Sequence, residues 1–469
     1  MATLPSIYTS TETVTAMQNA AADSSNDYKA IICFFMYGGM DSHNMLIPSG
    51  SNTNLAVYNA ARAEGVRIEQ NEVLSLSDNP NWSLHPKLDF LRYCYNNSTD
   101  NHLAILRNVG TLDRPITKTE YQQNPKVAPD QIFGHNIQQD IWQAALAPDV
   151  PRTSGWFGRM ANLMDPYFNG SQFTPSGVLS TTGNAIQNVA ILDTPPSIIP
   201  PVQMAYLSNG AFGTPSSGAN ATLVTQGNLM RHDNVATRTS IGVRNMMYEA
   251  YGAVLTGAID RQNALANTTT GLIDLPSSDS TAIDTATPTI GTSANRWRAA
   301  VKNVCRAILS RTSDRLNQRR QIFFVGVGGW DHHSNLRSQQ DVMLEQFDDA
   351  LNALTSRLAA YGLSNNVVMF TETEFSRTLT SNATGGTDHA WAGHSFILGG
   401  PVVNGLYGPE PVYTLNGTRD LGSGRYIPDI STEQYFATIA KWFGVPTAQL
   451  PIVLPNLQAY SPQTLGFLP

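Results

Sequence analysis

The sequence has little cysteine and few charged residues. Only three cysteines occur in 469 residues, and no Cys-x-x-Cys pair or mixed Cys/His spacing typical of a zinc site is present. Cys33 and Cys305 lie in apolar stretches, which is typical of core residues. We therefore expect neither a disulfide framework nor a thiolate metal centre.

The sequence also lacks an excess of positive charge and any long apolar run. Asp and Glu outnumber Lys and Arg by 36 to 29, which excludes the basic footprint of a nucleic-acid-binding protein. The apolar segment 30–36 is far too short to span a membrane. No export signal is recognisable in residues 1–5. The abundance of Asn, Ser, Thr and Gly is nevertheless common in exported bacterial proteins, and we expect a periplasmic or secreted protein.

The residues that are present indicate a packed α/β protein. Apolar residues make up 41% of the sequence and charged residues 14%, which excludes a disordered chain. Short apolar runs alternate with helical patterns, so the core should be a mainly parallel sheet with helices on both faces. The expected strands are 30–36, 103–106, 188–192, 321–327, 367–370 and 395–398. The clearest expected helices are 295–313, 341–361 and 435–443.

A change of composition divides the chain. Residues 1–28 form a polar N-terminal segment, and 29–194 together with 295–469 form the core. Residues 195–294 are rich in Ser, Thr, Gly, Asn and Pro, with a low-complexity run at 277–292. We interpret this segment as an insertion, either a lid or a cap over the core.

Six of the nine histidines occur in four short motifs at a strand end or a helix start. They are His43, His135, His332, His333, His389 and His394. The central motif is Gly-Gly-Trp-Asp-His-His at 328–333, directly after an apolar strand. Because ligands gather at the carboxyl ends of parallel strands, we expect Asp331 and His333 to bind a metal. The alternative is a polar loop whose histidines only form hydrogen bonds.

Two further motifs share this pattern. The segment 37–44 follows the first strand, and its two glycines allow a sharp turn that brings Asp41 and His43 to the strand end. The alternative for Asp41 is a helix cap. The segment 133–136 starts a helix with His135, for which the alternative is a surface histidine in a capping loop. The fourth motif, 387–394, precedes the last predicted strand and carries Asp388 and His389.

Imidazole and carboxylate without thiolate form a ligand set for a divalent cation. Zinc, manganese, iron, magnesium and calcium are all compatible with it. The number of candidate ligands exceeds the needs of one ion, so one or two ions are expected. Two ions about 4 Å apart can stabilise the entering and the leaving group of an ester.

These motifs resemble a bacterial family, the domain of unknown function 1501 family. The resemblance rests on Gly-Gly-x-Asp at 38–41, Gly-His-Asn-x-Gln-Gln at 134–139, Asp-x-His at 331–333, the segment 371–378, and Gly-Thr-Asp-His at 386–389. It extends from about Ile31 to the end of the chain. The family belongs to the alkaline phosphatase and sulfatase superfamily, so the resemblance implies an alkaline-phosphatase-like fold that hydrolyses phosphate or sulfate esters with bound metal.

The resemblance also implies roles for individual residues. Asp41 would bind one metal, and Asp331 and His333 the other. Asp388 and His389 precede the strand before which the superfamily supplies another ligand. Glu374 stands where the superfamily has an acidic ligand followed by His, and Phe375 replaces that histidine. Arg377 would hold the anion of the substrate, unless it forms only a surface salt bridge.

At the attacking group, this sequence departs from the pattern of the family. The family commonly has Ser immediately before the histidine that we number His135, but this sequence has Gly134. The resemblance therefore leaves Ser42, Thr117, Thr119 or a metal-bound water as the nucleophile, with His135 and Arg377 also in catalytic roles. The alternative is a non-catalytic secreted binding or structural protein that keeps the metal scaffold. We expect a small-molecule or glycan ester as substrate, and a homo-oligomer stays open.

Overall fold

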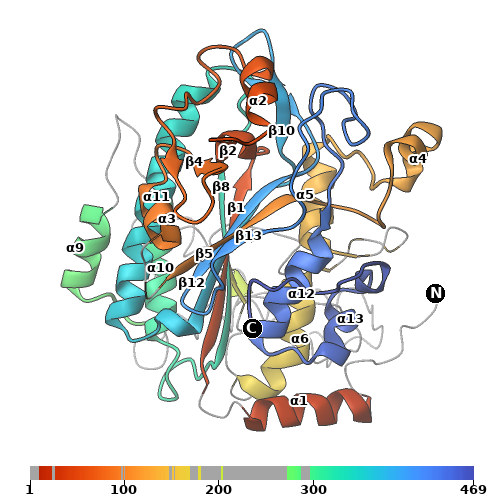
Figure 1. Ribbon diagram of the computed structural model, residues 1–469. Helices are drawn as coiled ribbons and strands as arrows, with labels where there is room; N and C mark the ends of the chain where they lie inside the picture. The colour runs from red at the N-terminus through yellow and green to blue at the C-terminus, as the bar shows by residue number, and fades with distance from the viewer. Residues whose placement is uncertain are drawn as a thin grey trace, which may run out of the picture.

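The computed structural model describes residues 10–23, 27–96, 99, 101–146, 150, 152, 154–169, 178–180, 202–203, 272–286 and 296–469. Its centre is a nine-stranded sheet in the order β13-β5-β12-β9-β1-β8-β6-β7, with β14 paired to β5 (Figure 1). The strands are β1 (Lys29–Tyr37), β5 (His102–Gly110), β6 (Val178–Ser180), β7 (Val202–Gln203), β8 (Arg320–Gly328), β9 (Val367–Glu372), β12 (Gly393–Gly399), β13 (Gly405–Tyr407) and β14 (Ile430–Ser431). Every pairing in this sheet is parallel except those of β12, which is antiparallel to both β5 and β9.

Helices cover both faces of this sheet (Figure 1). One face carries α3 (Asp89–Asn96), α9 (Ser277–Ala286), α10 (Arg296–Leu309) and α11 (Leu336–Ala360). The other face carries α1 (Thr11–Asp23), α5 (His135–Ala144), α6 (Trp156–Phe168), α12 (Thr432–Phe443) and α13 (Leu450–Val453). The prediction of an α/β fold with a mainly parallel sheet and helices on both faces is confirmed.

The apolar runs in the sequence follow from this layering. In β1, Ile32 and Phe34 point into the core under α10 and α11, whereas Ile31, Cys33 and Phe35 point into the core under α6 and α12. A strand that is buried on both faces has no polar side, so its sequence reads as one continuous apolar run. The three cysteines are free and buried, as expected for core residues.

Most predicted elements form, with different ends. The helix expected at 341–361 starts earlier, as α11 at Leu336, and the strand expected at 103–106 is longer, as β5 from His102 to Gly110. The strand expected at 188–192 lies outside the described residues. Within the predicted insertion, α9 packs on the core, since Asp279 accepts a hydrogen bond from Arg357 at 3.0 Å and another from Tyr361 at 2.6 Å. The low-complexity run at 277–292 thus begins with a core helix.

The reversed strand β12 decides where the motifs meet. Parallel strands β1, β8 and β9 end at one edge of the sheet, and an antiparallel strand starts at that same edge. The segment before β12 therefore lies beside the segments that follow β1, β8 and β9. That segment belongs to a hairpin of β10 (Arg377–Ser381) and β11 (Thr387–His389), in which Arg377 is opposite His389.

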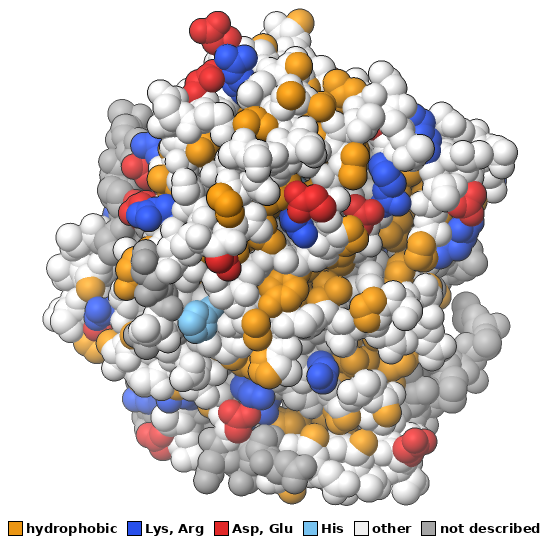
Figure 2. Space-filling model, in the orientation of Figure 1, with side chains coloured by type: hydrophobic (Ala, Val, Ile, Leu, Met, Phe, Trp, Pro, Cys, Tyr) orange, Lys and Arg blue, Asp and Glu red, His pale blue; other side chains and the backbone are white. Residues whose placement is uncertain are grey.

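Smaller elements complete the chain around this edge. A three-stranded sheet contains β2 (Leu46–Pro48), β3 (Leu74–Ser75) and β4 (Trp82–Leu84). The short helix α2 (Leu55–Ala61) lies near this sheet, and the short helix α4 (Lys118–Gln123) lies at the right of Figure 1. On the face in Figure 2, acidic and basic side chains are interspersed and neither sign gathers in a large patch. Among the described helices, none combines the length and the apolar composition needed to cross a bilayer.

Candidate metal centre

Two glycines after β1 allow the polar segments to approach one another closely. Gly38 has φ +127°, and a Cβ there would lie 2.4 Å from the backbone nitrogen of Asp331. Gly39 has φ +72°, and a Cβ there would lie 2.3 Å from the ring of Phe375. Both conformations suit glycine, and any side chain would push these segments apart. The Gly-Gly pair is thus the local reason that the ends of β1, β8 and β9 can form one site.

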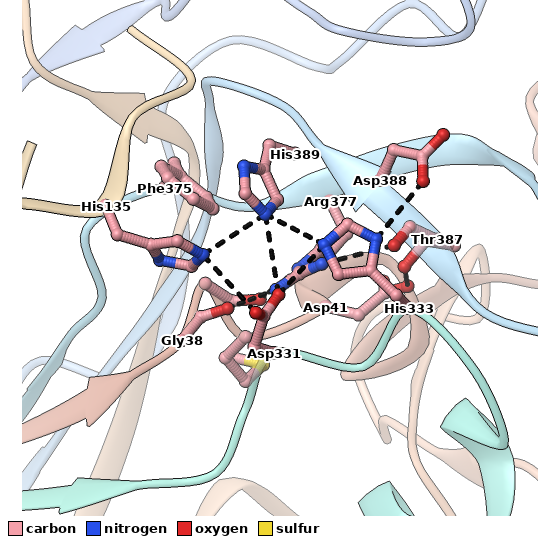
Figure 3. A network of polar contacts seen from close by, with 12 residues as sticks. Gly38, Asp41, His135, Asp331, His333, Phe375, Arg377, Thr387, Asp388 and His389 are labelled. Atoms are coloured by element: carbon pink, nitrogen blue, oxygen red, sulfur yellow. Dashed lines mark hydrogen bonds and ion pairs between the residues drawn. The ribbon is translucent and has the colours of Figure 1, made fainter. Parts of the chain in front are cut away.

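Three imidazoles and one carboxylate converge at this edge (Figure 3). Nε2 of His389 lies 3.1 Å from Nε2 of His135 and 3.0 Å from Nε2 of His333. Oxygens of Asp331 lie 3.1 Å from His333, 3.4 Å from His389 and 3.5 Å from His135, measured to the same nitrogens. His135, Asp331 and His389 each offer one donor atom within 4.8 Å of the others. The prediction that distant Asp and His motifs meet at the sheet edge holds for Asp331, His333 and His389.

The outer nitrogens of the same imidazoles are held by oxygen acceptors. Nδ1 of His389 donates to the backbone carbonyl of Phe133 at 2.8 Å, and Nδ1 of His135 contacts Glu374 at 2.7 Å. Nδ1 of His333 contacts Asp388 at 3.3 Å. Because a carbonyl oxygen can only accept, Nδ1 of His389 carries the hydrogen, and the carboxylates favour the same tautomer in the other two rings. The inner Nε2 atoms then present lone pairs to one another, an arrangement that a cation stabilises.

Glu374 orients a histidine and is not itself among the converging donors. Its side chain is fully buried, and Oε1 accepts hydrogen bonds from the backbone of Gly38 at 2.8 Å and from Gln139 at 2.9 Å as well as from His135. The hydrogen bond with Glu374 raises the pKa of His135. The ring of Phe375 packs 4.7 Å from His135 and 4.6 Å from His389, measured between ring centroids. Phe375 thus supports the two imidazoles from behind, which the sequence did not indicate.

Arg377 is a clamp inside the protein, and the alternative of a surface salt bridge is wrong. Its guanidinium is completely buried and donates to the carbonyl oxygens of Gly38 and Gly39, to that of Thr387, and to Asp331. Burial raises the pKa of Asp331, but the hydrogen bond and charge of Arg377 outweigh burial and hold that pKa below its ordinary value. Asp331 is therefore ionised, with Oδ1 facing His333 and His389 and Oδ2 facing His135. Each nitrogen of the Arg377 guanidinium therefore already donates to a group of the protein.

Asp41 lies outside the converging group. Its Oδ1 is 2.8 Å from Arg62 in an ion pair without solvent exposure, and it accepts the backbone N–H groups of His43 and Asn44. Its Oδ2 accepts the hydroxyl of Thr387 at 3.1 Å. The structure thus realises the capping alternative for Asp41, on a short 3-10 helix at Ser42–Asn44. Its placement does not support the predicted role as metal ligand, because both oxygens already have protein partners.

The candidate nucleophiles do not lie at the cluster. Ser42 is fully buried, with its hydroxyl 2.8 Å from that of Ser376 and accepting the N–H of His394 at 2.9 Å. Thr119 is exposed on α4, and Thr117 caps that helix by accepting the N–H of Glu120 at 3.2 Å. Gly134 is the residue before α5 and has no side chain to react. The structure therefore gives none of the predicted hydroxyls a path to the three imidazoles.

The remaining histidines of the motifs lie deeper. His43 and His394 are buried and both contact the hydroxyl of Tyr413, from Nδ1 and Nε2 respectively, each at 3.0 Å. We call these three residues the interior cluster, and His135, Asp331, His333 and His389 the rim cluster. Burial lowers the pKa of His43 to about 3 and that of His394 well below its ordinary value, so both rings are neutral. His332 is also buried, and burial lowers its pKa to about 4.

A pocket of about 400 Å³ opens beside the rim cluster. It is lined by Phe133, His333, Asp388, His389, Leu421 and Arg425. Asp388 sits at its edge with 48% of its side chain exposed, and its Oδ1 contacts His333 and accepts from Asn382 at 3.2 Å. Sequence analysis missed Leu421 and Arg425, which lie outside the histidine motifs, and it gave no role to Phe133 of the motif 133–136. The pocket gives the rim cluster access to a small molecule.

An α/β sheet whose strand ends gather three imidazoles and a carboxylate beside an open pocket defines a protein with a candidate metal centre. The chain belongs to the family "Protein of unknown function (DUF1501)", whose profile matches residues 28–449. The resemblance found in the sequence is thereby confirmed at the level of the family. Among curated proteins, no sequence matches.

Solved structures resemble the chain only distantly. Ps i-CgsB in complex with k-i-k-neocarrahexaose is 9% identical, with 92% of this chain and 77% of that chain covered and a TM-score of 0.31. Alkaline phosphatase from the Antarctic bacterium TAB5 is 12% identical, with 81% and 94% covered and a TM-score of 0.30, and a variant of that enzyme with Mg bound gives 0.31.

Proposed function

We propose that this protein is a metal-dependent hydrolase of phosphate or sulfate esters, with one divalent cation held by His135, Asp331, His333 and His389. The observation that carries the proposal is the set of inward-facing Nε2 atoms, each backed by an oxygen acceptor on Nδ1. Metal-binding histidines in proteins generally have this second hydrogen bond.

The distances at His389 and Asp331 support a compact cation. Donor atoms around a tetrahedral zinc ion with metal–nitrogen bonds of about 2.0–2.1 Å lie about 3.3 Å apart. The contacts of His389 and Asp331 with the other donors lie between 3.0 and 3.5 Å. Three imidazoles and one carboxylate favour zinc or manganese over magnesium or calcium. Asp41 and Glu374, which the sequence offered as ligands for a second ion, have protein partners instead, so we propose one ion.

The residues around the proposed ion have distinct roles. A bound ion would act as a Lewis acid on an ester oxygen and would lower the pKa of water. Arg377 fixes Asp331, Glu374 fixes His135, and Phe133 fixes the tautomer of His389. Asp388 is exposed beside His333 and has the position of a proton acceptor at the pocket. Since no Ser, Thr or Cys among the described residues lines the pocket, water is the attacking group that fits best.

A second candidate function is a metal-containing binding protein without catalysis. It is favoured by Gly134, which provides no hydroxyl, and by the burial of Ser42. A small-molecule or glycan ligand and a periplasmic or secreted location remain predictions under either function. Neither function requires a nucleic acid or a membrane span.

The test compares metal content with turnover. Purified protein is loaded with zinc or manganese, dialysed extensively and assayed for metal and for hydrolysis of nitrophenyl phosphate and nitrophenyl sulfate. We expect bound metal and turnover, and the loss of both after Asp331→Ala or a chelator. His102→Ala is the matched control, because it removes an imidazole that is only half-buried at the start of β5, away from the site. Bound metal without turnover of any ester supports the binding protein, and no bound metal contradicts both functions.

A further inference from the structure

The loop 420–426 is built as a rigid support at the pocket. Asp420 is fully buried, and its Oδ1 accepts the backbone N–H groups of Gly422, Gly424 and Arg425 at 2.7, 3.0 and 3.0 Å. Its Oδ2 accepts the N–H of Asn416 at 2.7 Å. Gly424 has φ +76° and packs so closely on Leu379 that a Cβ would lie 2.4 Å from that side chain. These contacts fix the backbone from which Arg425 projects.

The side chain of Arg425 is held along one edge. Its Nε donates to the carbonyl oxygen of His389 at 2.8 Å, and its Nη1 donates to that of Gly422 at 3.2 Å. The guanidinium lies over the ring of Phe133, 5.5 Å from the centroid. Nη2 has no hydrogen-bond partner among the described residues, and the residue lines the pocket. Arg425 is therefore a preorganised cation with a free edge next to a residue of the rim cluster.

Arg377, the arginine that the sequence offered for this role, differs on each of these points. It is completely buried, and its donors are taken by Gly38, Gly39, Thr387 and Asp331. An arginine recognises an oxyanion through free N–H groups in its planar fork. Among the described residues that line the pocket, only Arg425 meets that condition.

We propose that Arg425 binds a non-bridging oxygen of the anionic group of the substrate and so selects tetrahedral oxyanion esters. This inference rests on the proposed function, because it places the anion between Arg425 and the rim cluster. Leu421 and the edge of Phe133 supply the apolar part of the lining, and the volume of about 400 Å³ suits a single ring-sized group. Asp388 adds a negative charge to the lining, which disfavours a second anionic group nearby. The substrate class is thus a singly substituted phosphate or sulfate monoester of a ring-sized alcohol.

The experiment measures anion binding apart from turnover. Inorganic phosphate and inorganic sulfate are titrated by calorimetry into wild type, Arg425→Gln and Arg425→Lys, each with and without loaded zinc, and zinc affinity is measured in parallel. We expect Arg425→Gln to weaken anion binding about 10- to 100-fold, the range for a lost hydrogen bond to a charged group. Arg425→Lys should recover part of the loss, because it keeps the charge without the planar fork. The anion whose affinity falls more in Arg425→Gln identifies the preferred ester.

Arg92→Gln is the control of equal charge change, since Arg92 forms an ion pair with Asp89 on α3 outside the pocket. Unchanged zinc affinity and thermal midpoint in Arg425→Gln exclude a general loss of structure. Wild-type anion binding by zinc-loaded Arg425→Gln would overturn the inference and leave the proposed function standing. Absence of zinc binding in the wild type would instead refute the proposed function, and the metal-free titrations would still show whether Arg425 binds the anion.

Discussion

The rim cluster and the interior cluster both draw their histidines from the set of four sequence motifs, but the two have opposite chemistry. In the rim cluster, Nδ1 atoms face oxygen acceptors outside and Nε2 atoms converge beside Asp331. In the interior cluster, His43 and His394 share the hydroxyl of Tyr413, and Nδ1 of His394 accepts the N–H of Asn108 at 3.2 Å. A histidine motif thus becomes a candidate metal ligand only where a carboxylate and an open pocket accompany it.

The largest expected effect tests the rim cluster directly. His389→Ala removes the nitrogen that contacts both other imidazoles, and zinc affinity should fall more than about 100-fold, beyond the range for losing an outer partner. The fold should tolerate this change, because the His389 side chain is 24% exposed. Competition titration with a chromophoric chelator measures the affinity. Wild-type affinity in this variant would remove His389 from the site.

The matched change in the interior cluster should have the reverse result. His394→Ala leaves a cavity and removes a partner from the Tyr413 hydroxyl, at a cost of about 2–4 kcal/mol in the free energy of unfolding. Zinc affinity should stay unchanged. Denaturant unfolding and the same chelator titration provide the two readouts. A loss of zinc affinity without loss of stability would mean that the two clusters form one site.

A smaller loss of zinc affinity is expected when the buried partner of His135 is changed. Glu374→Gln keeps the size of the side chain but removes the charge that fixes the tautomer of His135. We expect zinc affinity to fall about 10- to 100-fold, as for other outer-layer partners. Asp388→Asn is the comparison at the exposed side, where solvent competes for His333, and its effect should be smaller. Equal losses of zinc affinity in the two variants would show that the burial of Glu374 does not strengthen its effect on His135.

The last expected effect concerns the stability of the fold in acid. Burial lowers the pKa of His43 to about 3 from 6.5, so the unfolded state binds a proton at a pH where the folded state does not. His43 therefore does not lower the free energy of unfolding above pH 6.5. As the pH decreases from 6.5 toward 3, this group lowers the free energy of unfolding by up to about 1.4 kcal/mol per pH unit. Unfolding of the metal-free protein at pH 7, 6 and 5 measures the slope. His43→Gln should reduce the slope, to which His394 and His332 still contribute, and an unchanged slope would contradict this assignment.

The sheet and much of the rim cluster were predictable from the sequence. Strands buried on both faces are visible as apolar runs, and parallel strands bring their ends together, which placed Asp331 and His333 correctly beside His389. The direction of β12 was not visible, although it is the reason that His389 reaches the same edge. Helix α9 was hidden by its Ser- and Thr-rich composition, because its stability comes from contacts with Arg357 and Tyr361 on α11.

The partners of the charged residues were not predictable. Asp41 is neutralised by Arg62, and Asp331 is held by Arg377, through contacts that depend on the folded loops. Sequence reasoning grouped the acids by their place at strand ends, which does not distinguish an acid facing the pocket from one facing the interior. Arg425 escaped notice for a related reason, since its role arises from Asp420 and the glycines that shape its loop. The signal available in the sequence was the pattern Asp-x-Gly-x-Gly-Arg at 420–425.

The position of β12 has a consequence for the order in which the protein matures. β12 lies between β5 and β9, so the sheet stays in two parts until residues 393–399 have been synthesised. His389 arrives only a few residues earlier, and its Nε2 contacts both other imidazoles of the rim cluster. A nascent chain that ends before His389 therefore has neither a continuous sheet nor a complete rim cluster. The rim cluster is complete only in the nearly finished polypeptide.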